Sequence, residues 1–153
     1  LNVEPDHFDC YPDMESLVAA FGAFAAKVDP AGFLLVRHDD HAALEAAQQA
    51  RAAVMTFGTQ PDADWWVSDL RRTAWGSRGR LFRRGQFVTE WQLPLPGRHN
   101  VSNALVAAAI GVELGVSTRE IRASLAEFPE LQRRLEPRGS YRGVTLLDDY
   151  AHH

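Results

Sequence analysis

The stretch from Phe33 to Phe57 reads FLLVRHDDHAALEAAQQARAAVMTF and sets the fold class of this chain. Residues 33–36 form a short, continuous apolar run, which is typical of a strand buried on both faces. Residues 41–52 are rich in alanine and predict a helix, and residues 54–57 predict the next strand. The stretch is therefore a strand–helix–strand unit, which implies parallel strands joined by a right-handed connection.

The same alternation continues towards the N-terminus. Residues 1–3 are typical of the end of a strand, and residues 13–28 predict a helix with Asp13 as its N-cap. Five apolar side chains fall on one stripe of that helix and are expected to be buried: Leu17, Ala20, Phe21, Phe24 and Val28. The order of elements predicts an α/β fold built on a mostly parallel sheet flanked by helices.

The middle of the chain has a different character. Three apolar runs predict short strands: residues 65–67, 81–82 and 86–95. Three pairs of residues predict tight turns: Gly76-Ser77, Arg78-Gly79 and Arg84-Gly85. Together they predict a small antiparallel sheet appended to the parallel one. The four tryptophans are expected to pack within it rather than to form a ligand cage: Trp65, Trp66, Trp75 and Trp91.

A Pro96-Gly97 turn then leads into an alanine-rich helix that opens with a polar cluster. The apolar positions of this helix recur at helical spacing and predict a buried face: Val101, Ala104, Leu105, Ala108 and Val112. Asn100 is the predicted N-cap, because its amide oxygen can accept from a first-turn N–H. The polar cluster has two interpretations. It either caps a core helix or holds a planar, polar ligand such as a nucleotide base.

The last third of the chain returns to helix and strand. Gly115 predicts a C-cap, and Ser117 with Glu120 three residues later predicts a capping box for a helix over residues 118–127. Its expected buried face carries three apolar side chains: Ile121, Leu125 and Phe128. Residues 133–136 and Tyr141 predict a strand or strand edge. Residues 144–147 predict a final buried strand, and residues 148–153 follow its carboxyl end, where open α/β sheets bind ligands.

Composition places the chain among ordinary globular proteins. Its 153 residues suffice for one domain, 46% are apolar and 24% charged, and no apolar run approaches the roughly 18–20 residues of a membrane span. One cysteine, Cys10, and a start with no basic residue and no signal-peptide pattern favour a reducing cytoplasm. The net charge of −4 argues against a nucleic-acid partner.

Charge is unevenly distributed along the chain. Residues 1–70 carry 12 acidic and three basic residues, whereas residues 71–153 carry eight acidic and 13 basic ones. This asymmetry suits a site where a metal ion meets phosphate, although solvated faces of opposite sign also account for it. No glycine-rich phosphate-binding loop with its lysine occurs, so any ATP-handling loop is expected to lie outside the chain.

The loop Glu4-Pro5-Asp6-His7-Phe8-Asp9 holds groups that suit a divalent cation. His7 with Glu4, Asp6 and Asp9 fits Mg²⁺ or Mn²⁺ coordination. The alternative is a polar turn whose aspartates cap the helix that follows.

Four ordered blocks resemble the Mur ligase family, the ATP-dependent enzymes that build the peptide stem of peptidoglycan. The blocks are residues 1–9, 97–104, 133–136 and 148–153. They look most like the branch that joins L-alanine to UDP-N-acetylmuramate. The resemblance implies that residues 1–153 are one domain, the later part of the central ATP-binding domain. The phosphate-binding loop and a UDP-binding domain are then expected before Leu1, and an amino-acid-binding domain after His153.

The resemblance also implies roles for individual residues. His7 resembles a catalytic ligand of Mg²⁺, and Arg134 resembles the catalytic arginine that reaches the transferring phosphate of ATP. The remaining positions resemble the adenine site (His99, Asn100 and Asn103), the ribose-binding acid (Asp149) and a hinge that faces the substrate (Tyr150, His152 and His153).

The implied reaction has two steps. ATP phosphorylates the carboxylate of UDP-N-acetylmuramate to an acyl phosphate, and the amine of L-alanine then displaces the phosphate. One alternative is the recycling ligase that attaches a ready-made tripeptide to the same substrate. Another is a nucleotide-binding module without ligase activity. Neither a nucleic-acid partner nor membrane insertion is expected.

Overall fold

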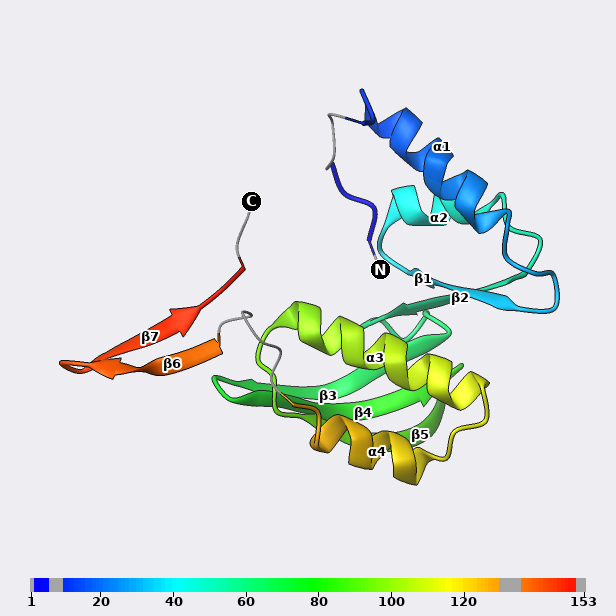
Figure 1. Cartoon of the computed structure of the whole chain (residues 1–153). Helices are drawn as coiled ribbons and strands as arrows, with labels where there is room; N and C mark the ends of the chain where they lie inside the picture. Colours follow the sequence, from blue (N-terminus) through cyan, green and yellow to red (C-terminus); the bar gives the residue numbers. More distant parts are fainter. Residues whose placement is uncertain (1, 6–9, 130–135, 151–153) are drawn as a thin grey trace.

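The computed structural model describes residues 2–5, 10–129 and 136–150 (Figure 1). Its helices are α1 (Met14–Ala25), α2 (His41–Ala47), α3 (Arg98–Glu113) and α4 (Thr118–Ala126). Its strands are β1 (Phe33–Arg37), β2 (Ala53–Gly58), β3 (Trp65–Thr73), β4 (Gly76–Arg83), β5 (Gln86–Leu93), β6 (Glu136–Tyr141) and β7 (Val144–Asp148). Within the described residues no helix has the length and apolar character needed to cross a membrane.

Five strands form one mixed sheet in the order β1-β2-β3-β4-β5. β1 pairs with β2 and β2 with β3 in parallel, whereas β3, β4 and β5 pair antiparallel. A separate antiparallel pair is formed by β6 and β7. The predicted fold class is confirmed, since helices flank a sheet that carries antiparallel strands. The three antiparallel strands continue the parallel part directly, through the pairing of Phe57 with Trp65.

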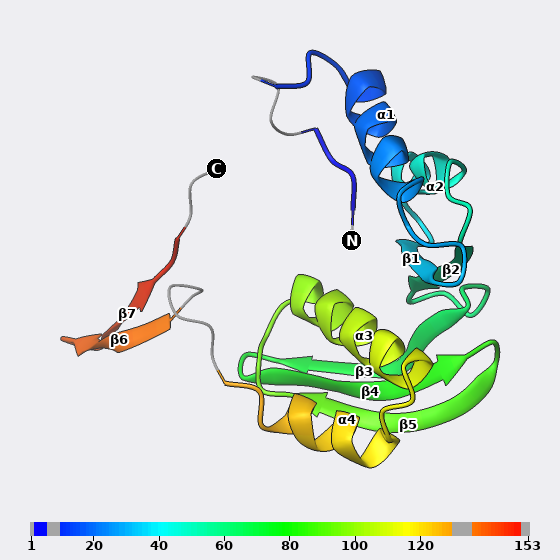
Figure 2. The ribbon, with the colours of Figure 1, turned by 45° about the vertical axis from the view of Figure 1, so that its right-hand side comes forward.

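The helices are placed by different parts of the sheet. α1 packs against α2, and α2 packs against β1. α3 crosses one face of the sheet over β2 and β3, and α4 lies along β5 (Figures 1 and 2). The core lies under α3. Trp65, Phe57 and Leu81 are its largest fully buried side chains. Burying a side chain of this size contributes about 1.5–3 kcal/mol.

The predicted caps are confirmed where they depend on neighbouring residues. The Asp13 carboxylate accepts from the Ser16 N–H at 2.8 Å and starts α1. Ser117 and Glu120 form the predicted capping box of α4. Gly115 follows the end of α3 with φ of +83°, and its N–H and that of Val116 bond back to the last turn. Four of the five predicted apolar positions on α3 are buried, and Val112 packs against the core half-buried.

The two N-terminal helices are shorter than predicted, and of the predicted stripe of α1 only Leu17 is fully buried. α1 ends at Ala25 and α2 at Ala47. Phe21 and Phe24 were expected on the buried stripe, but they are 42% and 65% exposed. The buried positions of α1 include the small Gly22, where an added Cβ would lie only 3.0 Å from Cγ of Gln49. The side of α1 that carries Gly22 therefore packs against α2 and the residues that follow it, because only a small residue leaves room for such close contact.

In the middle of the chain, one predicted turn and the predicted packing of one tryptophan are wrong. The predicted Arg78-Gly79 turn is wrong because both residues lie inside β4. Gly79 instead makes room for Trp91, since a Cβ there would lie 3.2 Å from Trp91 Cζ2. Trp75 was expected to pack but is 83% exposed, because it occupies the tip between β3 and β4. The other three tryptophans do pack, with Trp66 stacked on a phenylalanine ring.

The tight turns at the two hairpin ends differ. The Arg84-Gly85 turn is confirmed, with positive φ angles of 46° and 78°. Gly76 does not centre a turn, because it already belongs to β4 and pairs with Thr73.

The C-terminal strand prediction is correct in type and wrong in burial. β7 forms, but Val144, Leu146 and Leu147 are 62%, 50% and 54% exposed. Its partner is β6, and the pair stands apart from the five-stranded sheet (Figures 1 and 2). Phe128, which was also expected to be buried, is 38% exposed beyond the end of α4. Residues 133–135 of the predicted strand lie outside the described residues.

Candidate functional site

The start of α3 is organised by Gly97 rather than by Asn100. Gly97 is the N-cap, with φ of +100° and ψ of 147°, and it makes no side-chain cap. The prediction of Asn100 as N-cap is wrong, because the helix begins two residues earlier. The Asn100 amide nitrogen donates to the Pro96 carbonyl at 2.7 Å, which closes the turn that leads into the helix.

The imidazole of His99 lies directly against Gly97. A Cβ added at Gly97 would lie 2.7 Å from Cε1 and 3.1 Å from Nδ1 of the ring. Glycine is therefore required here both for the positive φ and for the space that the imidazole occupies. The ring is held at an exposed position at the beginning of the helix.

His99 and Asn103 are four residues apart on α3 and thus share one exposed face. No side chain of the N-cap satisfies the first-turn N–H groups, and the positive end of the helix dipole lies here. This end therefore offers an imidazole, an amide and backbone donors together. Because an amide both donates and accepts, the set fits the edge of a purine base.

Asp149 and Tyr150 follow β7 directly, and both are exposed. The antiparallel pair β6–β7, which leads to them, is stabilised by ion pairs of Arg138. Its guanidinium lies 2.9 Å from the carboxylate of Asp148 and 3.2 Å from that of Glu136. The Asp148 hydrogen bond, with help from Glu136, raises the pKa of Arg138 above its ordinary value. Asp148 thus has its ion-pair partner within β6–β7, and Asp149 is the next residue along the chain, just beyond the strand end.

Four predicted site residues lie outside the described residues: His7, Arg134, His152 and His153. The same holds for Asp6 and Asp9, the proposed neighbours of His7. Among the residues that are described, no three His, Cys, Asp or Glu side chains gather closely enough to hold a metal ion. Glu4 is exposed just before the undescribed loop.

No sequence pattern indicates a functional role for Asp40, although this residue bonds to the segment that leads to His7. One carboxylate oxygen accepts from the Val3 N–H at 2.7 Å, and the other caps α2 through the Ala43 N–H at 2.9 Å. An aspartate immediately before a helix is recognisable as a cap. Its second contact spans 37 residues and has no local signal.

Next to it, Arg37 and Asp39 pair at 2.6 Å. The hydrogen bond between them raises the pKa of Arg37 and lowers that of Asp39. The end of β1 therefore carries one neutralised ion pair beside the bridging carboxylate of Asp40.

Comparison with known proteins identifies similar sequences and folds. The family described as Mur ligase middle domain matches residues 1–111. UDP-N-acetylmuramate–L-alanine ligase of Acidothermus cellulolyticus is 42% identical over 99% of this chain and 32% of its own length. The enzyme of the same name from Caldanaerobacter subterraneus is 33% identical over 100% of this chain and 34% of its own length. The chain thus spans about a third of the length of the curated relatives it matches.

Solved structures agree on the fold. The crystal structure of MurF from Acinetobacter baumannii matches with a TM-score of 0.82 at 23% identity, over 97% of this chain and 32% of that one. The crystal structure of the UDP-N-acetylmuramate-alanine ligase MurC from Thermotoga maritima matches with a TM-score of 0.79 at 22% identity, over 99% and 34%.

Proposed function

Because the chain belongs to the Mur ligase family, through the middle domain of that family, we propose that it is part of an ATP-dependent ligase that joins L-alanine to UDP-N-acetylmuramate. The proposal is supported by identities of 33–42% to relatives of that name over nearly the whole chain. The single observation that carries the nucleotide role is the start of α3, where His99 and Asn103 project beside uncapped N–H groups. We place the protein in the cytoplasm, where this nucleotide substrate is made.

In this proposal the first turns of α3 hold the adenine of ATP. Asn103 both donates to and accepts from the base edge, and the His99 ring, which lies against Gly97, is beside it. Asn100 acts mainly by holding the turn, because one of its N–H groups is already bonded to Pro96. Asp149 accepts from the ribose hydroxyls.

The chemistry at the phosphates is assigned to residues outside the described part of the chain. His7 is the proposed ligand of Mg²⁺, which neutralises phosphate charge when bound. Arg134 presents a fixed fork of donors to the transferring phosphate. Asp40 fixes the backbone that leads to His7 through its bond to Val3. Tyr150, His152 and His153 face the acyl substrate at the junction with the next domain.

In the proposed reaction the carboxylate of UDP-N-acetylmuramate attacks the γ-phosphate of ATP, which gives an acyl phosphate and releases ADP. The amine of L-alanine then attacks the acyl carbon, and phosphate leaves with the bonding electron pair. The barrier is lowered mainly by positioning and by neutralisation of charge, because the reacting groups are held in one site.

The test is phosphate release by the full-length protein supplied with ATP and UDP-N-acetylmuramate. Release that depends on L-alanine supports the proposal, whereas release only with the tripeptide moves the assignment to the recycling ligase. A folded protein that is silent with both would be a nucleotide-binding module. His7→Ala and Arg134→Ala are expected to abolish release.

The adenine assignment has its own test. Asn103→Ala is expected to raise the KM for ATP by about tenfold, the loss of one to two hydrogen bonds, with little change in kcat. The matched control is Ala107→Ser, which lies one turn further along the same exposed face and is expected to leave KM unchanged. Equal effects of the two variants on the KM for ATP would contradict the assignment of the adenine base to this face.

A further inference from the structure

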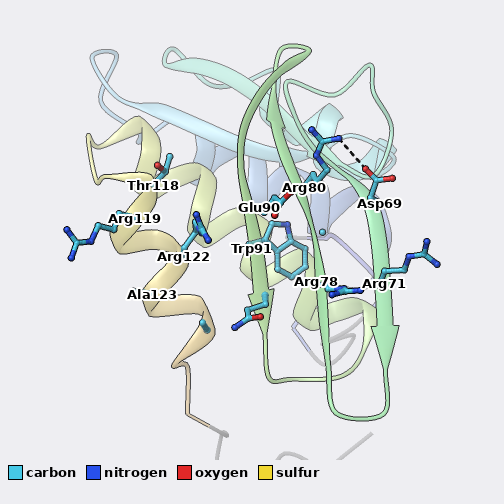
Figure 3. A pocket seen from close by; sticks show the side chains of 13 residues that line it. Asp69, Arg71, Arg78, Arg80, Glu90, Trp91, Thr118, Arg119, Arg122 and Ala123 are labelled. Atoms are coloured by element: carbon cyan, nitrogen blue, oxygen red, sulfur yellow. Dashed lines mark ion pairs between the residues drawn. The ribbon is translucent and has the colours of Figure 1, made fainter.

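A groove of about 940 Å³ is lined by residues of α4, β3, β4 and β5 (Figure 3). Five arginines line it: Arg71, Arg78, Arg80, Arg119 and Arg122. The lining also contains two carboxylates, those of Asp69 and Glu90. We call this feature the arginine groove. No residue of α3 contributes to it. The β4 side chains that line it are the exposed members of an alternating pattern whose buried members, such as Leu81, face the core under α3.

One of the five arginines is already engaged within the fold. Arg80 lies 3.6 Å from the carboxylate of Asp69. Its guanidinium also sits over the ring of Phe87 at 4.8 Å and near that of Phe82 at 5.5 Å. This arginine therefore already has partners on the outer face of the sheet.

The other four arginines have no such partner. Within the described part of the chain, no carboxylate lies within 4.0 Å of Arg71, Arg78, Arg119 or Arg122. Arg71 and Arg78 are direct cross-strand partners, an arrangement in which like charges repel. Nothing described in the fold offsets this repulsion, so an anion bound between the two would stabilise them.

The four arginines form two pairs on opposite walls. Arg71 and Arg78 belong to the sheet, whereas Arg119 and Arg122 are three residues apart on α4 and so share one side of the helix. In Figure 3 Arg78 lies on the sheet side and Arg122 on the helix side, with Arg71 and Arg119 extending outward. The groove thus has one arginine on each wall, Arg78 on the sheet and Arg122 on the helix, with Arg71 and Arg119 at its rims.

The carboxylate of Glu90 defines which end of the groove suits an anion. Glu90 is paired in register with Arg80, at the engaged end. Gln92 is paired with Arg78 at the other end and offers a neutral amide. An anion would therefore lie at the Arg78 end, away from Glu90.

We propose that the arginine groove binds a small molecule carrying two separated phosphate groups, one bound from the sheet wall by Arg78 and the other from the helix wall by Arg122. The guanidinium fork matches phosphate oxygens two at a time. The groove volume lies within the range of small-molecule sites, about 300–1,000 Å³. Such a site goes beyond the proposed ligase function and uses none of its residues.

Isothermal titration calorimetry on the full-length protein tests the proposal with two matched probes, fructose 1,6-bisphosphate and fructose 6-phosphate. The bisphosphate is expected to bind at least about tenfold tighter, because only it can contact the arginines of both walls. Arg78→Gln and Arg122→Gln are each expected to weaken it by about tenfold and to erase its advantage. Arg51→Gln, an exposed arginine outside the groove, is the control and should bind as wild type does.

Three outcomes would overturn the proposal. The first is no binding of the bisphosphate at millimolar concentration, and the second is binding that the two groove variants leave unchanged. The third is tighter binding of an acidic peptide through the same arginines, which would make the groove a protein-docking surface. Arg78→Lys guards against misfolding, since it keeps the charge and should give intermediate affinity. Because the readout is binding, its failure leaves the ligase proposal untouched.

Discussion

Replacing Gly97 by alanine tests the central geometry of the α3 start. At φ of +100° and ψ of 147°, Gly97 occupies a backbone region that is nearly restricted to glycine. Forcing an alanine there costs about 1–3 kcal/mol. The new Cβ would also lie 2.7 Å from His99 Cε1, closer than real Cβ contacts occur, so the imidazole must leave its position. Displacing the ring adds about 1 kcal/mol if it is driven off its rotamer.

The matched control is Gly115→Ala. Gly115 also has positive φ, +83°, but an added Cβ there meets no atom within 4 Å. Its cost is therefore the left-handed backbone alone, about 1–2 kcal/mol. We expect Gly97→Ala to be the more destabilising by about 1–2 kcal/mol in urea denaturation followed by tryptophan fluorescence. It should also raise the KM for ATP, and we expect the same of His99→Ala because both changes remove the imidazole from its position.

A double-mutant cycle separates the two contributions. In a His99→Ala background, Gly97→Ala should lower the free energy of unfolding only by the cost of the backbone strain. The effects of the two substitutions on ATP affinity should not add. The reasoning is refuted if Gly97→Ala costs no more than Gly115→Ala. It is also refuted if the cost is the same with and without the imidazole.

Three further predictions concern stability. Burial opposes ionisation of Asp64, but hydrogen bonds from Thr56 and Arg84 outweigh it and lower the pKa of Asp64. The stabilisation that the ionised Asp64 gives to the fold is present above its unfolded pKa of about 3.9 and is lost as pH falls through the folded pKa. Asp64→Asn should therefore flatten the acid side of a curve of unfolding free energy against pH. Glu113→Ala should cost about 2 kcal/mol in urea denaturation, since it leaves the fully buried Trp65 Nε1–H without its acceptor at 3.1 Å. Ser117→Ala should cost about 1 kcal/mol by the same assay through loss of the capping box, and an unchanged midpoint would contradict that role.

Much of the fold could be predicted because its causes are local. The apolar run at 33–36 and the capping box at Ser117 depend on residues within one or two turns of each other, so they act whatever the rest of the chain does. The same is true of the polar opening of α3, whose exposed His99 and Asn103 follow from helical spacing. For the candidate site, the sequence indicates which side chains could bind a ligand. It does not show which of them already make hydrogen bonds within the fold.

The errors share a non-local cause. Asn100 has the right chemistry for an N-cap, yet Gly97 takes that position because its positive φ redirects the chain earlier. Phe21 and Phe24 are as apolar as any core residue, but α2 meets α1 at the small Gly22 instead. Trp75 lies at a hairpin tip that no helix covers in the described residues. Periodicity identifies which side chains share a face and leaves open what that face meets.

The sequence by itself determined the element types, the caps of α1 and α4 and the family to which the chain belongs, since these depend on short-range spacing and on residue identity. Only the tertiary structure decided the joining of β2 to β3, the bond from Val3 to Asp40 and the gathering of arginines from β3, β4 and α4 around one groove. These features bring together residues that are distant in the chain. Their partners are chosen by packing and by strand pairing, because the energy of a contact depends on what lies opposite and not on what precedes it.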